Sequence, residues 1–158
     1  MYNFIKISSG NRKKVIGFVT SNWGAPIMVN KGKVHHMDKL PGFIAEENES
    51  IIGLITFSIN NGECEIVSLD SLSENKGIGS RLIELVIERA LAEKCHRVWL
   101  ITTNDNTKAI RFYQKRGFDM TAFYRNSVEK SRKIKPEIPK QGNDNIPILH
   151  EIEFEYML

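Results

Sequence analysis

The stretch of sequence that decides the fold runs from residue 63 to residue 82 and reads ECEIVSLDSLSENKGIGSRL. Its first half has the apolar and β-branched content of a strand, and Gly77 and Gly79 then open a helix. That helix places four apolar residues on one face: Ile78, Leu82, Leu85 and Val86. Glycines at a strand-to-helix junction let backbone amides approach a ligand, and a helix N-terminus is partly positive. The stretch therefore favours a phosphate site, with a simple tight turn as the alternative interpretation.

The whole chain has the composition of one soluble domain, which we predict to span residues 1–158. It has 158 residues, of which 41% are hydrophobic and 26% charged. No run approaches the ~20 apolar residues that cross a bilayer, and residues 1–6 do not resemble a signal peptide. A net charge of +3 is too small to indicate nucleic acid binding. We expect a cytoplasmic protein with neither a nucleic acid nor a membrane partner.

The cysteines and histidines do not have the spacing of a metal site. Cys64 and Cys95 are far apart in the sequence and have no paired Cys nearby. The four histidines are His35, His36, His96 and His150, and no two have the i, i+4 spacing of a helical metal site. We therefore predict no metal and interpret the two cysteines as buried structural thiols.

The periodicity of the rest of the chain predicts an α/β (α+β) fold with a mixed, mostly antiparallel sheet and helices on both faces. An Asn-Gly pair at residues 61–62 is a strong hairpin signal between two β-rich runs. The expected strands are residues 2–7, 43–46, 51–59, 63–69, 96–102, 118–124 and 151–158. The expected helices are residues 11–22, one that starts near residue 77, one that ends at Arg116, and residues 125–133. In the last strand, alternation places Glu151, Glu153 and Glu155 on the face opposite the apolar residues.

Two long stretches, residues 23–39 and 135–147, have no regular period and are expected to be loops. Loops of this length in a compact domain are usually functional or disordered, and Trp23, His35 and His36 would be unusual in a disordered one. A Trp that caps the core beside two surface histidines is the alternative interpretation.

Two motifs together resemble the GNAT superfamily of N-acyltransferases. Common nucleotide motifs do not match, because residues 74–79 lack the Walker pattern and Leu82 stands where a third Rossmann glycine would be. Residues 74–79 (ENKGIG) instead resemble the superfamily pattern [QR]-x-x-G-x-[GA], with Glu74 as a departure at the first position. Residues 106–118 resemble its N-x-x-A-x-x-F-Y-x-x-x-G-F segment. Asn106 and Tyr113 are two helical turns apart and thus share one face.

The resemblance implies one GNAT-like domain that binds acetyl-CoA, as acyl donor, between strands 63–71 and 98–102, which would splay apart. The backbone of Leu69 and Ser71, with Asp70 between them, would pair with the pantetheine arm. Main-chain amides would hold the pyrophosphate at Lys76, Gly77, Ile78, Gly79 and Ser80. The candidate partners of the 3′-phosphate are Lys76, Arg81, Lys108 and Arg111. The alternative interpretation of each is a solvated surface charge. Asn106 and Tyr113 would also contact the donor.

The resemblance also implies an enzyme that acetylates a primary amine by direct attack in a ternary complex. Such a transfer needs a base, a stabilised oxyanion and a proton for the leaving thiolate. Glu63 and Glu65 lie on one face of their strand and are the candidate bases, or else ordinary surface charges. The amide of Leu69 would polarise the thioester carbonyl, and Tyr113 would protonate the thiolate. A covalent route through Cys64 is disfavoured, because alternation places it on the opposite strand face.

The acceptor is a small-molecule or peptide amine that the sequence does not identify. In the fold implied by the resemblance, the two irregular stretches border the acceptor, so Trp23 would form an apolar wall and His35 or His36 a polar contact. A homodimer is an open alternative for the assembly. Two other functions remain as alternatives, a non-catalytic acyl-CoA-binding regulatory module and a nucleotide-binding regulator.

Overall fold

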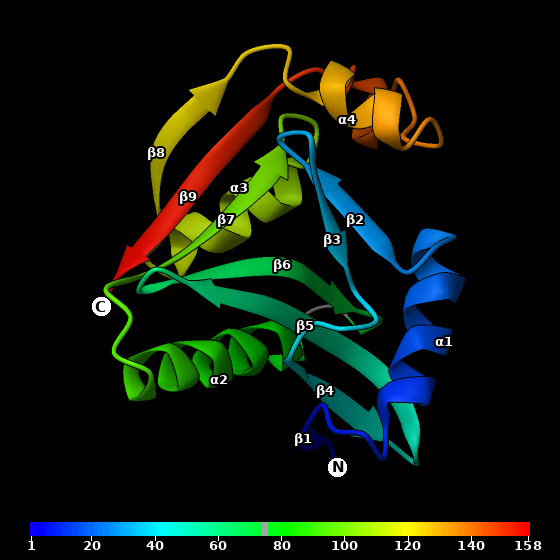
Figure 1. Ribbon diagram of the computed structural model, residues 1–158, viewed down its shortest axis with the longest axis vertical. Coiled ribbons are helices and arrows are strands. Elements are labelled where there is room, and N and C mark those ends of the chain that lie inside the picture. The colour runs from blue at the N-terminus through cyan, green and yellow to red at the C-terminus, as the bar shows by residue number, and fades with distance from the viewer. Residues whose placement is uncertain (74–75) are drawn as a thin grey trace. The chain divides into compact units, whose positions relative to one another are not determined.

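The computed structural model describes residues 1–73 and 76–158 (Figure 1). Its helices are α1 (Arg12–Trp23), α2 (Ile78–Ala92), α3 (Thr107–Lys115), α4 (Val128–Ile134) and the short 3-10 helix η1 (Asn143–Asn145). Its first five strands are β1 (Asn3–Lys6), β2 (Ile27–Asn30), β3 (Lys33–His36), β4 (Gly42–Glu47) and β5 (Ser50–Asn60). The remaining strands are β6 (Glu63–Ser71), β7 (Arg97–Thr103), β8 (Asp119–Tyr124) and β9 (Glu151–Met157). None of the helices in these ranges is long and apolar enough to cross a membrane.

Seven strands follow one another in the order β1-β4-β5-β6-β7-β9-β8, and β2 pairs with β3 in a separate two-stranded sheet. The mixed α/β fold is the one predicted. The chain divides into two compact units. The first unit contains residues 1–28, 35–98 and Leu158, and the second contains residues 29–34 and 99–157.

The first unit is built on the antiparallel meander that the sequence predicted. β4 pairs with β5, and β5 pairs with β6. Asn61 and Gly62 both have positive φ, 52° and 75°, as the type I′ hairpin turn requires. The strong Asn-Gly signal therefore marks the real turn between β5 and β6.

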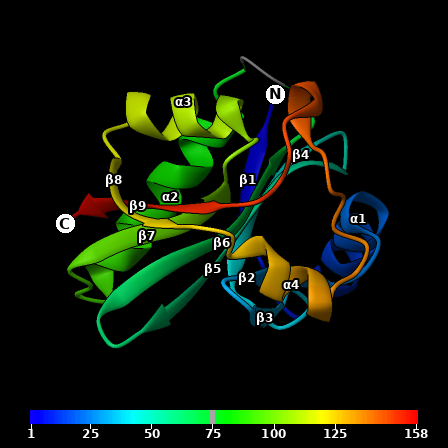
Figure 2. The same cartoon turned by 90° about the horizontal axis from the view of Figure 1, so that it is seen from above.

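Helices α1 and α2 cover opposite faces of this meander (Figures 1 and 2). Ile44 and Leu54 belong to the apolar cluster that includes Val15 and Val19 of α1. Gly53, the neighbour of Leu54, faces the other way: a Cβ there would lie 2.8 Å from Cγ2 of Ile78 in α2. The alternation of the strand thus sends successive residues to different helices, and the two faces are called the α1 face and the α2 face.

The expected loop over residues 23–39 was wrong, because it contains the hairpin β2–β3 (Figure 1). Each strand has only four residues, too few for a clear period. The turn between them has Lys31 and Gly32 at φ 48° and 73°, again the type I′ conformation. The Lys-Gly pair is a weaker signal than Asn-Gly because only one of its residues adopts positive φ easily.

The second unit joins β8 and β9 in an antiparallel pair with a register shift between Met120 and Ala122. Helix α4 begins three residues later than predicted, at Val128. The stretch 135–147 is irregular apart from η1. Its C-terminal end is hydrogen-bonded to Asn104, whose side-chain nitrogen donates to Pro147 O at 2.9 Å and whose side-chain oxygen accepts from Leu149 N at 3.0 Å. This irregular stretch is therefore anchored to the connection between β7 and α3.

Candidate functional site

The glycine junction has the geometry expected of an anion-binding helix start. Gly77 is the N-cap of α2 with φ 75°, and a side chain added there would meet none of the described residues within 4 Å. No side chain in the described ranges caps this helix, and its first turn has no acidic residue. The first amides of a helix have no acceptor within the helix, so the amides from Ile78 onward are suited to bind an anion. The Glu74 departure lies outside the described residues.

The proposed cationic side chains differ in their surroundings. Arg81 makes ion pairs with Glu84 and Glu88, each with a closest N···O distance of 3.1 Å. Lys76, Lys108 and Arg111 are exposed. A phosphate at Arg81 would therefore have to compete with two carboxylates.

Strand β6 sends the side chains of its acidic candidates to the α1 face. In an antiparallel pair, directly opposite residues share a face, and Asp70 lies opposite Leu54 on the α1 face. Leu69 and Ser71 lie opposite Ile55 and Gly53, on the α2 face.

Glu65 also lies on the α1 face, because a register shift interrupts the alternation of β6 at Val67. Ile66 is opposite Phe57, whose ring lies 5.6 Å from Cζ of Arg89 in α2, so Ile66 faces α2 and Glu65 faces away from it. The shift therefore brings Glu65 and Asp70 to one face although they are five residues apart.

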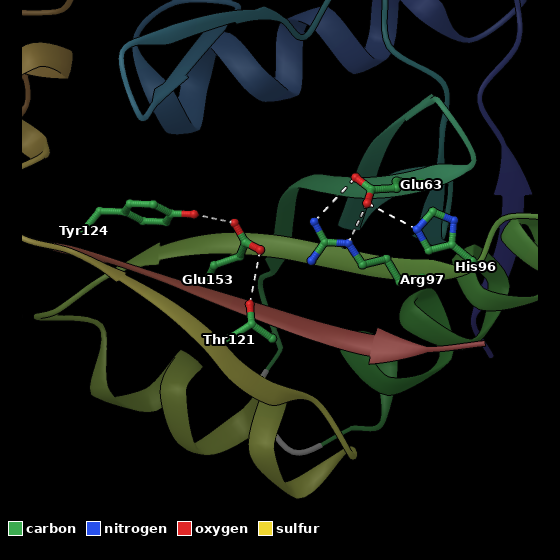
Figure 3. A network of polar contacts seen from close by, with 6 residues as sticks. All are labelled: Glu63, His96, Arg97, Thr121, Tyr124 and Glu153. Atoms are coloured by element: carbon green, nitrogen blue, oxygen red, sulfur yellow. Dashed lines mark hydrogen bonds and ion pairs between the residues drawn. The ribbon is translucent and has the colours of Figure 1, made fainter.

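Glu63, one of the two candidate bases, is held in a surface ion-pair network (Figure 3). Arg97 donates from Nε to Oε1 at 3.0 Å and from Nη2 to Oε2 at 3.4 Å, and His96 Nε2 lies 3.3 Å from Oε1. The Arg97 hydrogen bond lowers the pKa of Glu63 below its usual value, and burial opposes it only in part. This arrangement makes Glu63 a weak base.

Glu65, the second candidate base, is buried beside a histidine. Its Oε2 lies 3.7 Å from Nε2 of His35 in β3, and the two residues are only 5% and 4% exposed. His36, the alternative acceptor contact, is exposed on the opposite side of β3. The structure therefore brings together two residues that the sequence had placed in separate roles.

Trp23 and Asp70, which the sequence assigned to different sites, are hydrogen-bonded to each other. The indole Nε1 donates to Oδ2 of Asp70 at 3.0 Å. Burial raises the pKa of Asp70, and the bond from Trp23 opposes that rise. Because Trp23 lies at the end of α1, this contact also places it on the α1 face, which Glu65 shares.

Tyr113 and Asn106 belong to the second unit. Tyr113 is 7% exposed, and its ring centroid lies 5.5 Å from that of Phe118 and 6.1 Å from that of Phe154. The side chain of Asn106 caps α3 by accepting from Ala109 N at 3.2 Å. Asn106 thus has a structural role in addition to the one implied by the resemblance.

Alternation places the glutamates of β9 on one face without indicating a role for them, and the structure buries two of them. Glu153 is 8% exposed and accepts hydrogen bonds from the Tyr124 hydroxyl at 2.8 Å and from Thr121 Oγ1 at 3.1 Å (Figure 3). Glu151 is 2% exposed and accepts from Lys31 N at 3.1 Å. Alternating glutamates in a terminal strand are usually solvated, so only the fold reveals these two.

The cysteines are free thiols, and both are buried. Burial raises the pKa of Cys64 to about 12, so almost no thiolate forms at neutral pH. The register places Cys64 opposite Ile59, on the face of β6 away from Glu65, as alternation predicted. In the described ranges no three His, Cys, Asp or Glu side chains are grouped to hold a metal ion.

Comparisons with known proteins show the family and the fold of this chain. The model described as "Acetyltransferase (GNAT) family" matches residues 25–118. The uncharacterized protein YdhI of Bacillus subtilis (strain 168) is 47% identical over 142 residues, 89% of each chain. An IAA acetyltransferase from Bacillus cereus superposes with a TM-score of 0.76 at 16% identity, covering 100% of both chains. A GNAT acetyltransferase from Elizabethkingia anophelis with acetyl-CoA bound has a TM-score of 0.70 at 18% identity, covering 99% of this chain and 98% of that one. At such low identities, the two structural matches show the fold.

Proposed function

Because the chain belongs to the GNAT family of acetyltransferases, we propose that it transfers the acetyl group of acetyl-CoA to a primary amine by direct attack in a ternary complex. The observation that carries this proposal is the N-terminus of α2 at Gly77, where no side chain of residues 1–73 or 76–158 caps the helix and its first main-chain amides are suited to bind a pyrophosphate. A solved relative of the same fold holds acetyl-CoA, which supports the choice of donor.

The proposed donor site follows the end of β6 and the start of α2. The amides of residues 76–80 bind the pyrophosphate, and the backbone of Leu69–Ser71 pairs with the pantetheine arm. The candidate partners of the 3′-phosphate are Lys76, Lys108, Arg111 and Arg81, of which the first three are exposed. The guanidinium of Arg81 is ion-paired with Glu84 and Glu88, so a phosphate there would have to compete with two carboxylates. Splaying of β6 from β7 around the donor remains part of this proposal.

The proposed chemistry uses one base and one acid. Glu65 accepts the amine proton, and Glu63 is the weaker candidate base, because its hydrogen bond from Arg97 lowers its pKa. The Leu69 amide stabilises the developing oxyanion. The hydroxyl of Tyr113 donates its proton to the thiolate.

The proposed acceptor site is the α1 face of β6. Trp23 and His35 both contact carboxylates of this strand, Asp70 and Glu65, and carboxylates suit an acceptor that carries an amine. Trp23→Ala should therefore raise the acceptor KM and leave the acetyl-CoA Kd nearly unchanged.

We also propose a cytoplasmic location, which the two free thiols support. A homodimer is likewise a proposal for the assembly of this chain.

The decisive experiment measures thiol release from acetyl-CoA with a panel of amino sugars, polyamines, amino acids and peptide N-termini. We expect amine-dependent release together with a product heavier by one acetyl group. Binding of acetyl-CoA without turnover on any amine would favour the alternative of a non-catalytic acyl-CoA-binding module. Stabilisation by ATP but not by CoA would favour a nucleotide-binding regulator.

A further inference from the structure

The pair formed by His35 and Glu65 is unusual among the charged contacts of the first unit. Both side chains are more than nine-tenths buried, and His35 Nε2 lies 3.7 Å from Glu65 Oε2. By contrast, the ion pair of Glu63 lies near the surface, with the glutamate side chain 32% exposed. The other three histidines of the chain are exposed or half-buried. His35 is thus placed differently from every other histidine.

Stability alone is a poor explanation for this pair. Burying a carboxylate and an imidazole costs both groups their hydration free energy. Their mutual attraction often does no more than offset this desolvation cost. An apolar pair of similar volume would fill the same space without the desolvation cost. A buried titratable group with a specific charge partner is a candidate for a functional site, where the partner can hold a carboxylate in one orientation.

The location of the pair is that of the proposed acceptor. Glu65 lies on the α1 face of β6, where Asp70 accepts a hydrogen bond from Trp23. His35 is presented by β3, a strand of the hairpin that the sequence pattern did not reveal. A separation of 3.7 Å suits an ion pair and is slightly long for a hydrogen bond. Catalytic contacts are often longer than this ideal before the substrate binds.

We propose that His35 is a positioning residue that orients the Glu65 carboxylate as the base for acetyl transfer; this inference rests on the proposed function. Glu65 takes a proton from the attacking amine while the nitrogen forms its bond to the acetyl carbon. The carbon–sulfur bond then breaks, and the thiolate receives its proton from Tyr113. Glu65 afterwards releases one proton to water, and Tyr113 takes one up.

The test compares substitutions of His35 with matched controls. His35→Gln keeps an N–H donor near the position of Nε2, whereas His35→Leu removes it at similar volume. Lys33→Leu makes the same polar-to-apolar change at an exposed site in the same strand. Glu65→Gln removes the base, and the double variant His35→Leu/Glu65→Gln completes a thermodynamic cycle. For each protein, kcat and acceptor KM, acetyl-CoA Kd and Tm are measured.

A positioning role predicts that His35→Leu lowers kcat about 10-fold or more, with acceptor KM and acetyl-CoA Kd changed less than about 3-fold. His35→Gln should restore most of kcat, and Lys33→Leu should match the wild type. In the Glu65→Gln background, His35→Leu should have little further effect, because the group that it orients is gone.

The proposal is overturned if His35→Leu keeps the wild-type kcat, or if it lowers kcat by the same factor with and without Glu65. If His35→Leu does not fold, His35→Asn takes its place, because the shorter Asn amide should not reach Glu65. Equal kcat values for His35→Asn and His35→Gln would then reject the positioning role. A wild-type chain that acetylates no amine refutes the proposed function itself. An active chain that is insensitive to His35 refutes only the positioning role.

Discussion

Tyr113 combines a structural and a proposed chemical role in one side chain. Its ring packs against Phe118 and Phe154, while its hydroxyl is the proposed proton donor. Tyr113→Phe keeps the ring contacts and removes only the hydroxyl. We expect kcat to fall by ~10²-fold while the acetyl-CoA Kd, measured by calorimetry, stays within about 2-fold. Wild-type turnover in this variant would show that the hydroxyl does not supply the proton.

The ion pair of Glu63 predicts a pH-dependent contribution to stability. Its folded pKa is lowered from 4.5, chiefly by Arg97, so the carboxylate stabilises the fold fully above about pH 4.5. The contribution is lost as the pH falls through the lower folded pKa. Glu63→Gln should therefore cost about 0.5 kcal/mol at pH 7 and much less near pH 3. Urea unfolding at both pH values measures the difference.

Arg97→Gln provides the reciprocal test of the same pair, since it removes the other partner. We expect its loss of stability to shrink over the same pH range. A gap between wild type and Glu63→Gln that is equally large at both pH values would contradict the role given to this ion pair.

At the scale of elements, the junction between β6 and α2 carries the donor site. Gly79 lies in the first turn of α2, where a β-branched side chain would obstruct the approach of a pyrophosphate to the amides. Gly79→Val should weaken CoA binding at least about 10-fold, measured by titration calorimetry. Gly17→Val is the matched control, because Gly17 is an exposed helical glycine of α1 with open space around it. Equal CoA affinity in both variants would reject this placement of the pyrophosphate.

At the scale of the whole molecule, the chain is predicted to distinguish CoA from NAD. CoA at 100 times its Kd should stabilise the folded state by ~2.7 kcal/mol, which corresponds to a rise in Tm of about 5–10 °C for a chain of this size. NAD at the same concentration should leave Tm unchanged. A shift with NAD as large as that with CoA would argue against a site specific for acyl-CoA.

The prediction of one domain over residues 1–158 also belongs to this scale. Strand β7 begins in the first compact unit and continues into the second, so we expect the units to unfold together. Scanning calorimetry should show one transition whose calorimetric and van't Hoff enthalpies agree. Two resolved transitions would mean that the units are separate domains.

The sequence by itself determined the elements whose signals are local. The Asn-Gly turn, the apolar face of α2 and the glycine junction depend on residues within a few positions of one another. Periodicity and turn chemistry are therefore enough to identify them. The two motifs at residues 74–79 and 106–118 also indicated the family, because their spacing along the chain is preserved.

Only the tertiary structure decided which partner each candidate residue has. Arg97, 34 residues away, holds Glu63 and lowers its pKa, whereas His35, presented by a hairpin of four-residue strands, lies beside Glu65. The same fold buries Glu151 and Glu153, which alternation alone could not assign to the interior. The physical reason is that burial and charge pairing are set by contacts between segments far apart in the chain, and no local pattern encodes them.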